Sequence, residues 1–429
     1  MTKFKNFQPW LIWGLGAAFF FAEYFARVAP SVMVPDLMLA FSVSAMSLGA
    51  LSAFFYYPYV AMQVPVGTLM DYFGPHKLLT VAALICGISC FVFAGSHLLW
   101  VAKLSRFIMG FSAAFAFVGA LKLATLWFKP THLGLLAGLT QGLGMLGAAV
   151  GQGPVSLVVA HVGWRYAMFL IGGVLLFLAL LIFTFVRDHN VQGYHHHGSP
   201  IVGTEAGFLD GLFAVLKNKH TWINSLFVGL LYAPTAAFAE LWGVSYLERT
   251  YDIHRNLAAT GISFIFIGWA LGSPIWGCLS DRIGRRKPIM IISALLSLIM
   301  MSIVLYIPHL PLVLLFAALF LYGVSNTGVA ISYAVAGELN PREIAGVSIA
   351  FTNMASVLLG AFFQPIIGWL LDKHWDGMMR EGIPYYSAMD FRLAMATLPL
   401  CLILAFVMVF FLKETYCRGS HDETLMDHH

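Results

Sequence analysis

The stretch GCLSDRIGRRK, residues 277–287, has a weaker counterpart in GTLMDYFGPHK, residues 67–77. Asp281 follows Asp71 by 210 residues. Three further pairs of landmarks keep almost the same offset: Pro130 and Pro341 (211), Gln152 and Gln364 (212), and Gly147 and Gly360 (213). Four pairs in one order and with nearly one offset indicate an internal repeat. The sequence therefore predicts a duplicated unit that fills most of the chain.

The composition places this repeat in a membrane. Of the 429 residues, 60% are hydrophobic and only 10% are charged, well beyond the values of soluble domains. Apolar runs recur near the length of about 20 residues that a helix needs to cross the bilayer, and lipid leaves backbone groups no partner outside a helix. The expected spans are residues 10–34, 46–70, 77–96, 98–127, 132–156, 164–187, 221–246, 257–280, 287–307, 311–337, 343–371 and 390–413.

These spans predict an all-α polytopic membrane protein with about twelve transmembrane helices in two pseudo-symmetric six-helix bundles. We expect an N-terminal bundle at residues 1–187, a cytoplasmic linker at residues 188–218 and a C-terminal bundle at residues 219–429. Lysine and arginine concentrate in the loops on the side of both termini, which favours a cytoplasmic position for that side. The net charge of +4 follows from this bias and needs no nucleic-acid partner.

The motifs that the chain lacks narrow its function. The sequence contains no GxxxxGK[ST] motif, which argues against an ATP-driven pump. The five cysteines lack metal-ligand spacing, and no pattern indicates a nucleophile or a redox site, so we predict no enzyme, no cofactor and no metal centre. Duplicated helical halves are instead typical of secondary transporters, whose substrate site lies between the repeats near the bilayer midplane.

The repeated loops, with RFIMG at 106–110 and GLTQGLGMLGAAVGQGP at 138–154, resemble those of the major facilitator superfamily. Within it, YFARVAPSVMVPDL at 24–37 is similar to the anion:cation symporter group. That resemblance implies import of small organic anions with protons and an arginine of the first span in the site, a position that Arg27 matches. In that group an acidic residue often follows the arginine of span four. This chain lacks the acidic residue, so the resemblance does not identify the residue that carries the proton.

The paired loops are expected to form a cytoplasmic gate. An aspartate at a helix end beside arginines, near another helix N-terminus, can join the two halves through charge-assisted hydrogen bonds and the helix dipole. The candidate gating residues are Gly67, Asp71, Gly277, Asp281, Arg282, Arg285 and Arg286. The alternative is that the aspartates cap helices and the basic residues only set the topology.

The stretch FFFAEYFARVAP, residues 19–30, places two opposite charges inside the first span. A charge at the bilayer centre costs on the order of 2.5–3.5 kcal/mol, so such a residue faces a bundle interior or water. Glu23 and Arg27 lie one helical turn apart and can pair, and Pro30 should free a carbonyl and kink the helix. We expect Arg27 to bind an anionic group and Glu23 to carry a proton or bind a substrate amine. An inert structural ion pair is the alternative.

Two further deep charges are site candidates. Arg106 in span four is expected to be a second anion clamp, or else a partner for Glu23 or a helix end. Glu240 in span seven is expected to share proton coupling with Glu23, because a buried carboxylate can change its charge when an anion arrives. A hydrogen-bonded structural acid is the alternative for Glu240.

Polar residues complete the candidate site. Tyr24 neighbours Glu23, and Tyr322 and Asn326 share one face of span ten by their i, i+4 spacing. The sequence leaves open whether Lys103, Lys122 and Glu338 line the site. The other polar residues in the spans are expected mostly to join helices through hydrogen bonds: Gln63, Gln141, Gln152, Tyr232, Tyr333, Asn353 and Gln364.

These residues predict proton-coupled uptake of a small carboxylate-bearing anion or zwitterion by alternating access. An organic acid, an amino acid or peptide, and a polycarboxylate siderophore all fit. We expect a monomer in a bacterial inner membrane whose partners are the solute, protons and the lipid bilayer. Two alternatives stay open: proton-antiport efflux of amphipathic compounds, and a non-transporting receptor derived from a transporter.

Overall fold

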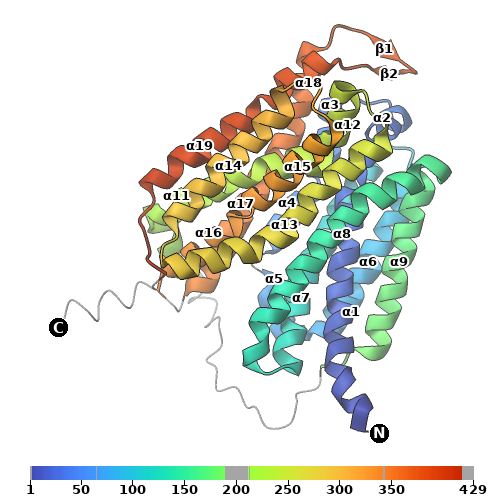
Figure 1. Cartoon of the computed structure of the whole chain (residues 1–429). Coiled ribbons are helices and arrows are strands. Elements are labelled where there is room, and N and C mark those ends of the chain that lie inside the picture. The colour runs from blue at the N-terminus through green and yellow to red at the C-terminus, as the bar shows by residue number, and fades with distance from the viewer. Residues whose placement is uncertain (1, 64, 189–210, 212, 342–343, 418–429) are drawn as a thin grey trace.

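The computed structural model describes residues 2–63, 65–188, 211, 213–341 and 344–417, and these residues are almost entirely helical (Figure 1). The first half contains α1 (Thr2–Val28), η1 (Ala29–Val32), α2 (Val34–Phe41), α3 (Ala45–Ala53), α4 (Tyr56–Met62), α5 (Pro65–Phe73), α6 (Pro75–Gly95), α7 (Leu99–Trp127), η2 (Pro130–His132), α8 (Leu133–Val162) and α9 (Trp164–Phe185). The second half contains α11 (Lys219–Pro234), η3 (Thr235–Trp242), α12 (Gly243–Tyr251), α13 (Arg255–Ile283), α14 (Lys287–Tyr306), α15 (Leu312–Asn326), α16 (Val329–Glu338), α17 (Ala345–His374), β1 (Met379–Arg380), β2 (Ile383–Pro384), α18 (Ala388–Met395) and α19 (Thr397–Phe411).

The described helices form two bundles. Among the described residues, eleven candidate spans are long and apolar enough to cross a membrane, and there are twelve if the bent pair of α2 with α3 and α4 counts as one span. In the first half α1 packs on α7 and α8, and α6 packs on α9; in the second half α11 packs on α17 and α19. The predicted all-α architecture of about twelve transmembrane helices in two bundles is confirmed (Figure 1).

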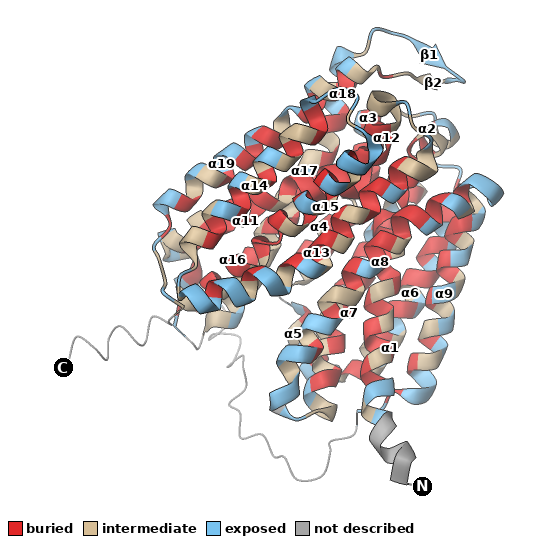
Figure 2. Ribbon diagram, in the orientation of Figure 1, coloured by how far each residue is buried: buried red, intermediate tan, exposed pale blue. Residues whose placement is uncertain are grey.

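The outer faces of the bundles are apolar. Large side chains such as Phe177 and Phe183 on α9, and Phe410 on α19, are exposed, whereas the residues between helices are buried (Figure 2). An apolar surface of this extent suits hydrocarbon, which is the environment that the helices require.

Pro30 ends the first helix. A proline has no N–H to donate to the carbonyl four residues earlier, which here is that of Ala26. The α-helix accordingly gives way to the short 3-10 helix η1 at Ala29. The α-helical pattern thus ends one residue after Arg27, while a bend of the helix axis at this point stays a prediction.

The second span is not the continuous helix that was predicted for residues 46–70. Its hydrogen bonding is interrupted between α3 and α4, and α5 begins at Pro65. Pro58 cannot donate to Phe54, and Pro65 cannot donate to Ala61, so each proline removes one helical hydrogen bond. The expected span rested on the apolar composition of this stretch, and the interruptions within it follow from its prolines.

The seventh span contains a π-helix. After Pro234 the backbone widens into η3, which carries Glu240, before α12 restores the α-helical pattern. Such segments are rare and occur frequently at functional sites. The tenth span is also interrupted, between α15 and α16 at residues 327–328.

The repeat is visible in equivalent contacts. A Cβ on Gly147 of α8 would collide with the backbone of Phe21 on α1, and a Cβ on Gly360 of α17 would lie 2.5 Å from Ala236 on η3. Each glycine therefore lets the fifth helix of its half approach the first helix of that half closely.

The two halves meet mainly along two helix pairs, α8 with α13 and α3 with α17. The start of α1 and the end of α19 lie at one end of the bundles, called the terminal end here; α2, α18 and the β1–β2 hairpin lie at the opposite, far end (Figure 1). Most of the linker predicted at residues 188–218 lies outside the described residues. Its boundaries, and those of the two predicted domains, stay a prediction.

Candidate functional site

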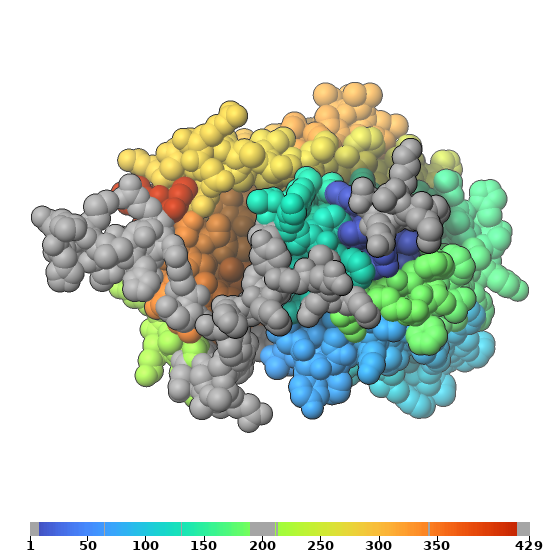
Figure 3. All heavy atoms as spheres, turned by 90° about the horizontal axis from the view of Figure 1, so that it is seen from below, coloured from blue at the N-terminus to red at the C-terminus, as the bar shows by residue number. Residues whose placement is uncertain are grey.

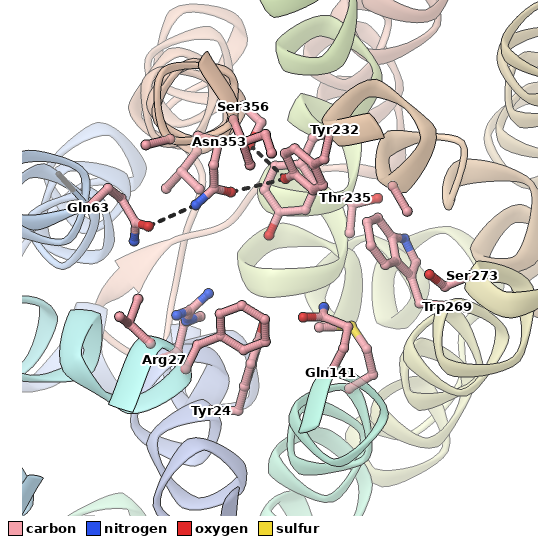
Figure 4. Close-up of a pocket in the computed structure, with 18 of the residues that line it drawn as sticks. Tyr24, Arg27, Gln63, Gln141, Tyr232, Thr235, Trp269, Ser273, Asn353 and Ser356 are labelled. Carbon is pink, nitrogen blue, oxygen red and sulfur yellow. Dashed lines mark hydrogen bonds between the residues drawn. The ribbon is translucent and has the colours of Figure 1, made fainter. Parts of the chain in front are cut away.

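A cavity of about 430 Å³ lies between the two bundles. Its polar lining from the first half consists of Tyr24, Arg27, Gln63 and Gln141, and that from the second half includes Tyr232, Glu240, Trp269, Tyr333 and Asn353 (Figure 4). Phe117 and Phe266 contribute apolar walls. The cavity therefore combines a few polar groups with aromatic surface, which is typical of sites for small molecules.

The cavity reaches toward the terminal end. Arg27 and Glu240 at its inner wall are buried, whereas Gly346 and Ile349, near the terminal end of α17, are exposed. Figure 3 shows the molecule from this end, with the first-half helices in blue to green beside the second-half helices in yellow to orange.

At the far end the halves are sealed together. The Asp372 carboxylate accepts hydrogen bonds from the backbone N–H groups of Ala45 (3.1 Å) and Met46 (3.0 Å) at the start of α3. Arg255 binds Asp36 across the same boundary at 2.6 Å. The cavity is thus closed on one side and open on the other.

Arg27 lies at the cavity wall on the last turn of α1. Its Nη2 donates to Glu23 Oε1 at 2.9 Å, and its Nε is buried without a hydrogen-bond partner in the described residues. The guanidinium stacks on the rings of Tyr24 (4.3 Å) and Tyr59 (4.6 Å). The Arg27 guanidinium thus has one carboxylate oxygen as acceptor and two aromatic rings on its faces. Some of its N–H donors remain unused, and its planar group is held in a fixed position.

Glu23 supports Arg27 from behind. It is fully buried, it is not part of the cavity lining, and its Oε2 atom has no partner among the described residues. The predicted i, i+4 pair is present in the structure. Arg27 faces the cavity, and Glu23 does not.

Glu240 faces the same cavity from the second half. Tyr232 donates to its Oε1 at 2.7 Å, and Tyr56 of the first half donates to its Oε2. Both carboxyl oxygens are therefore bound by phenols, and the described residues place no ion-pair partner on this acid. The Tyr56 bond also joins the two halves at the cavity.

Three side-chain amides bind backbone carbonyls, two in the π-helix that carries Glu240 and one in the last turn of α11 before it. Asn326 donates to the carbonyl of Leu231 (2.8 Å), Gln364 to that of Ala236 (2.9 Å), and Gln152 to that of Ala239 (2.8 Å). Backbone carbonyls inside a membrane need partners, and these amides supply them. Gln152 and Gln364, which are repeat-related in sequence, thus converge on one segment.

Arg106 lies away from the cavity. Its guanidinium donates to the carbonyls of Ala26, of Arg27 (3.2 Å) and of Ser52 (3.4 Å), and it is fully buried. The Ala26 carbonyl is the one that Pro30 leaves without a helical donor. In this conformation Arg106 occupies a helix end, which was the alternative to a second anion clamp.

We expect Arg106→Gln to lower the free energy of unfolding by about 3 kcal/mol, because it leaves buried carbonyls unpaired. Anion affinity should change no more than a few-fold. Thermal unfolding and ligand titration of the purified protein measure the two effects. Arg165→Gln is the matched control, since Arg165 also binds helix-end carbonyls, of Ala94 and Ser96, in a more exposed place. If Arg106→Gln left the stability unchanged and abolished anion binding, the prediction that Arg106 is a second anion clamp would be supported instead.

Tyr322 and Asn326 lie one layer behind the cavity. The Thr235 hydroxyl, which lines the cavity, lies 3.0 Å from the Tyr322 hydroxyl and donates to Asn326 Oδ1 at 2.9 Å. Both residues are buried and position η3, while direct substrate contact is not possible for them in this conformation.

Several of the residues expected mostly to join helices line the cavity instead. Asn353 of α17 donates to Gln63 Oε1 across the two halves at 2.9 Å (Figure 4). Tyr333 donates to Asn353 Oδ1 at 3.0 Å. Gln141 and Tyr232 also line it. In the sequence, only the spacing of these residues along each helix indicated their position. That spacing does not show whether a helix face borders a cavity or a neighbouring helix.

The gating candidates form ion pairs within each half. Asp71 binds Lys122 at 2.5 Å, and Asp281 binds Arg286 at 2.7 Å. Burial alone would lower the pKa of Arg286, but its hydrogen bonds to Glu338 and Asp281 raise that pKa above its usual value. Gly67 and Gly277 adjoin open space, Arg282 is exposed, and Arg285 lies over the Tyr416 ring. Neither of these two ion pairs joins the halves, as an open terminal end requires.

The residues left open by the sequence do not line the cavity. Lys122 binds Asp71, Glu338 binds Arg286 at 2.8 Å, and Lys103 lies over the Phe54 ring. In the part of the chain that the structure describes, no group of three or more His, Cys, Asp or Glu side chains could hold a metal ion.

Comparison with known proteins gives consistent matches. A family model described as Major Facilitator Superfamily matches residues 16–251 and 241–422. The chain is 30% identical over 290 residues to the "Probable sulfoacetate transporter SauU" of Cupriavidus necator, a match that covers 64% of this chain and 66% of that protein. It is 25% identical over 388 residues to the "Membrane sensor protein UhpC" of Salmonella typhimurium, covering 85% of each chain.

A solved structure supports the fold. The crystal structure of a bacterial homolog to the human lysosomal transporter Spinster, in an inward-facing and unoccupied conformation, superposes with a TM-score of 0.77. The two chains are 15% identical, and the match covers 94% of this chain and 97% of that one. At this identity the likeness concerns the fold alone.

Proposed function

The chain belongs to the Major Facilitator Superfamily, and we propose that it is a secondary active transporter that takes up a small organic anion together with protons. Family membership makes it a multi-pass transport protein and not an enzyme. The solute, the proton coupling and the direction belong to the proposal, as do an inner-membrane location with cytoplasmic termini and function as a monomer.

One observation carries the proposal: Arg27 is the single cationic side chain among the described residues that line the cavity. Its planar guanidinium suits a carboxylate or a sulfonate. The similarity to a protein named a sulfoacetate transporter supports an anionic solute. An amine is a weaker fit, because both oxygens of the facing acid Glu240 already accept phenol hydrogen bonds.

The proposed coupling follows from charge balance around Arg27. An anion that binds Arg27 competes with Glu23 for the guanidinium, and the cavity gains negative charge next to two carboxyl groups. Uptake of a proton by one of them offsets that charge. Glu240 is the favoured carrier because it faces the cavity and has no ion-pair partner in the described residues, whereas Glu23 lies behind Arg27.

A ligand screen tests the proposal. We would measure the melting temperature of the purified protein with sulfoacetate, short carboxylates, amino acids and amphipathic cations at two pH values, since a ligand of the native state raises it. Uptake of each hit into proteoliposomes follows. Stabilisation by cations alone would favour efflux of amphipathic compounds, the second candidate, and remove the basis of the anion proposal.

A receptor role is the third candidate, because the chain resembles a protein named a membrane sensor over 85% of its length. Tight anion binding with no movement of the anion in proteoliposomes would support it.

Under alternating access, the far-end seal must open in each cycle. We expect Asp372→Ala to favour the open far end by about 2 kcal/mol, or roughly 30-fold, because the mutation removes charged acceptors from the Ala45 and Met46 N–H groups. Burial, with the bond to Asp372, raises the pKa of Tyr386 well above its usual range, so this phenol donates to the seal over all working pH values.

Spin labels at the exposed positions Leu39 and Met389 measure the opening, because a larger fraction of the molecules should then show a long distance between the two labels. The accessible Cys278 and Cys417 would first be replaced by serine. Asp376→Ala is the matched control, because Asp376 binds only the Met378 N–H in its own half. An unchanged distance distribution for Asp372→Ala would contradict the assignment of this contact as a gate.

A further inference from the structure

Gln152 of α8 connects the segment that follows Arg27 to the segment that carries Glu240. The Gln152 side chain is fully buried. Its Nε2 donates to the Ala239 carbonyl in η3 at 2.8 Å, and its Oε1 accepts from the Ser31 hydroxyl in η1 at 2.8 Å. Both ends of the amide are therefore used, and the bond to Ala239 crosses from the first half of the chain to the second.

The two connected segments adjoin the two charged groups that line the cavity. Ser31 follows Arg27 by four residues, which is about one helical turn. Ala239 directly precedes Glu240. The segments η1 and η3 also contact each other. Gln152 thus ties the backbone beside the anion site to the backbone beside the proton site across the boundary between the halves.

Neither connected segment is a regular α-helix. The segment η1 is a 3-10 helix and η3 is a π-helix, and such departures often mark hinges or functional sites. The Ser31 hydroxyl has a single hydrogen, and the Val28 carbonyl lies 2.7 Å from it as a second acceptor. Ser31 can therefore release Gln152 without leaving its own donor unpaired, so the connection can open and close in a transport cycle.

We infer that Gln152 is a positioning residue that couples the anion site at Arg27 to the proton site at Glu240. This inference rests on the proposed proton-coupled uptake and adds the residue that links its two steps. When the anion draws Arg27 away from Glu23, η1 moves with the last turn of α1, and Gln152 passes this displacement to the backbone of Glu240. Without Gln152 the two segments move independently, and the anion can cross without a proton.

Replacing Gln152 leaves every charged group around Glu240 in place. The ionisable side chains that bind this acid or interact with it electrostatically come from α1, α4, α7 and α11: Glu23, Tyr24, Arg27, Tyr56, Arg106 and Tyr232. Gln152 itself carries no charge. A change of proton coupling in a Gln152 variant therefore reports the position of Glu240 and not the loss of a charge.

Gln152→Leu removes both hydrogen bonds of the connection. The probes are labelled sulfoacetate, lactate, succinate and glutamate, tested in proteoliposomes with an inward gradient of 2 pH units. With one coupled proton, we expect the wild type to accumulate its best probe about 100-fold, and Gln152→Leu to accumulate that probe about 10-fold or less. Counterflow of the same probe should stay within about 3-fold of the wild type, which shows that the variant folds and binds the anion.

Asn224→Leu is the matched control. Asn224 is also a fully buried amide in an apolar helix, and it donates to a backbone carbonyl, that of Ser332, at 2.9 Å. Both of these residues belong to the second half and lie outside the cavity lining. The variant should lower the melting temperature and keep accumulation within about 2-fold of the wild type. Ser31→Ala, which removes the other partner of Gln152, should lower accumulation in the same way and replaces Gln152→Leu if that variant does not fold.

The outcomes separate this inference from the proposed function. Wild-type accumulation in the folded Gln152→Leu or Ser31→Ala variant, or an equal loss in Asn224→Leu, would overturn the inference. The proposed function would still stand if the wild type accumulates a probe and Glu240→Gln does not. If the wild type accumulates none of the four probes, the proposed function is overturned and this inference with it.

Discussion

Replacing Arg27 should reduce uptake of the transported anion about 100-fold or more. Truncating one partner of a buried, hydrogen-bonded charge pair costs 2–5 kcal/mol or more in binding, and Arg27 is the cationic residue of the described cavity lining. Arg27→Lys keeps the charge but loses the planar fork that grips a carboxylate at two points. Initial uptake rates and ligand affinities of reconstituted protein measure the effect.

The Arg27 variants must not leave the buried carboxylate of Glu23 without a partner. Arg27→Gln alone strands Glu23, which is fully buried, and could prevent folding. The double variant Glu23→Gln with Arg27→Gln removes both charges and leaves no buried charge unpaired, so its melting temperature should stay closer to that of the wild type than the melting temperature of Arg27→Gln does. Lys103→Gln is the control for a cation outside the cavity. If the folded double variant took up the anion at the wild-type rate, the Glu23 and Arg27 pair would have only a structural role.

The Glu23 and Arg27 pair shows how far the sequence predicts this site. Two charges one helical turn apart in an apolar span predict a pair inside a bundle, and Pro30 predicts a freed carbonyl. The partner of that carbonyl is Arg106, 80 residues further along the chain. Its charge alone indicated a buried position but did not separate an anion clamp from a helix end. That choice depends on how α7 packs against α1.

The amides and phenols were harder to place for the same reason. Gln152, Gln364 and Asn326 stabilise the π-helix, whereas Gln63 and Asn353 face the cavity. In sequence, all five are uncharged amide side chains in largely apolar helices. The difference arises from the prolines and the π-helix, which leave some carbonyls without helical donors and turn particular faces toward open space.

Replacing Glu240 should abolish proton-driven accumulation while leaving exchange intact. With one coupled proton, a gradient of 2 pH units sustains about 100-fold accumulation at equilibrium, since each unit is worth 1.36 kcal/mol. Glu240→Gln resembles the permanently protonated acid, and its amide can keep hydrogen bonds to Tyr56 and Tyr232. We expect accumulation near 1-fold in this variant, with counterflow of labelled anion within a few-fold of the wild type.

The matched control is Glu248→Gln, two turns further along the same span. Glu248 lies 3.9 Å from Arg255 at the far end and outside the cavity lining, so accumulation should persist in this variant. Glu23→Gln distinguishes the two carrier candidates. Loss of accumulation in Glu23→Gln, with accumulation retained in Glu240→Gln, would transfer the proton to the acid behind Arg27. A carrier must bind and release its proton in each cycle, and that result would show that Glu240 does neither. The phenol bonds of Glu240 would then serve only to join the two halves at the cavity.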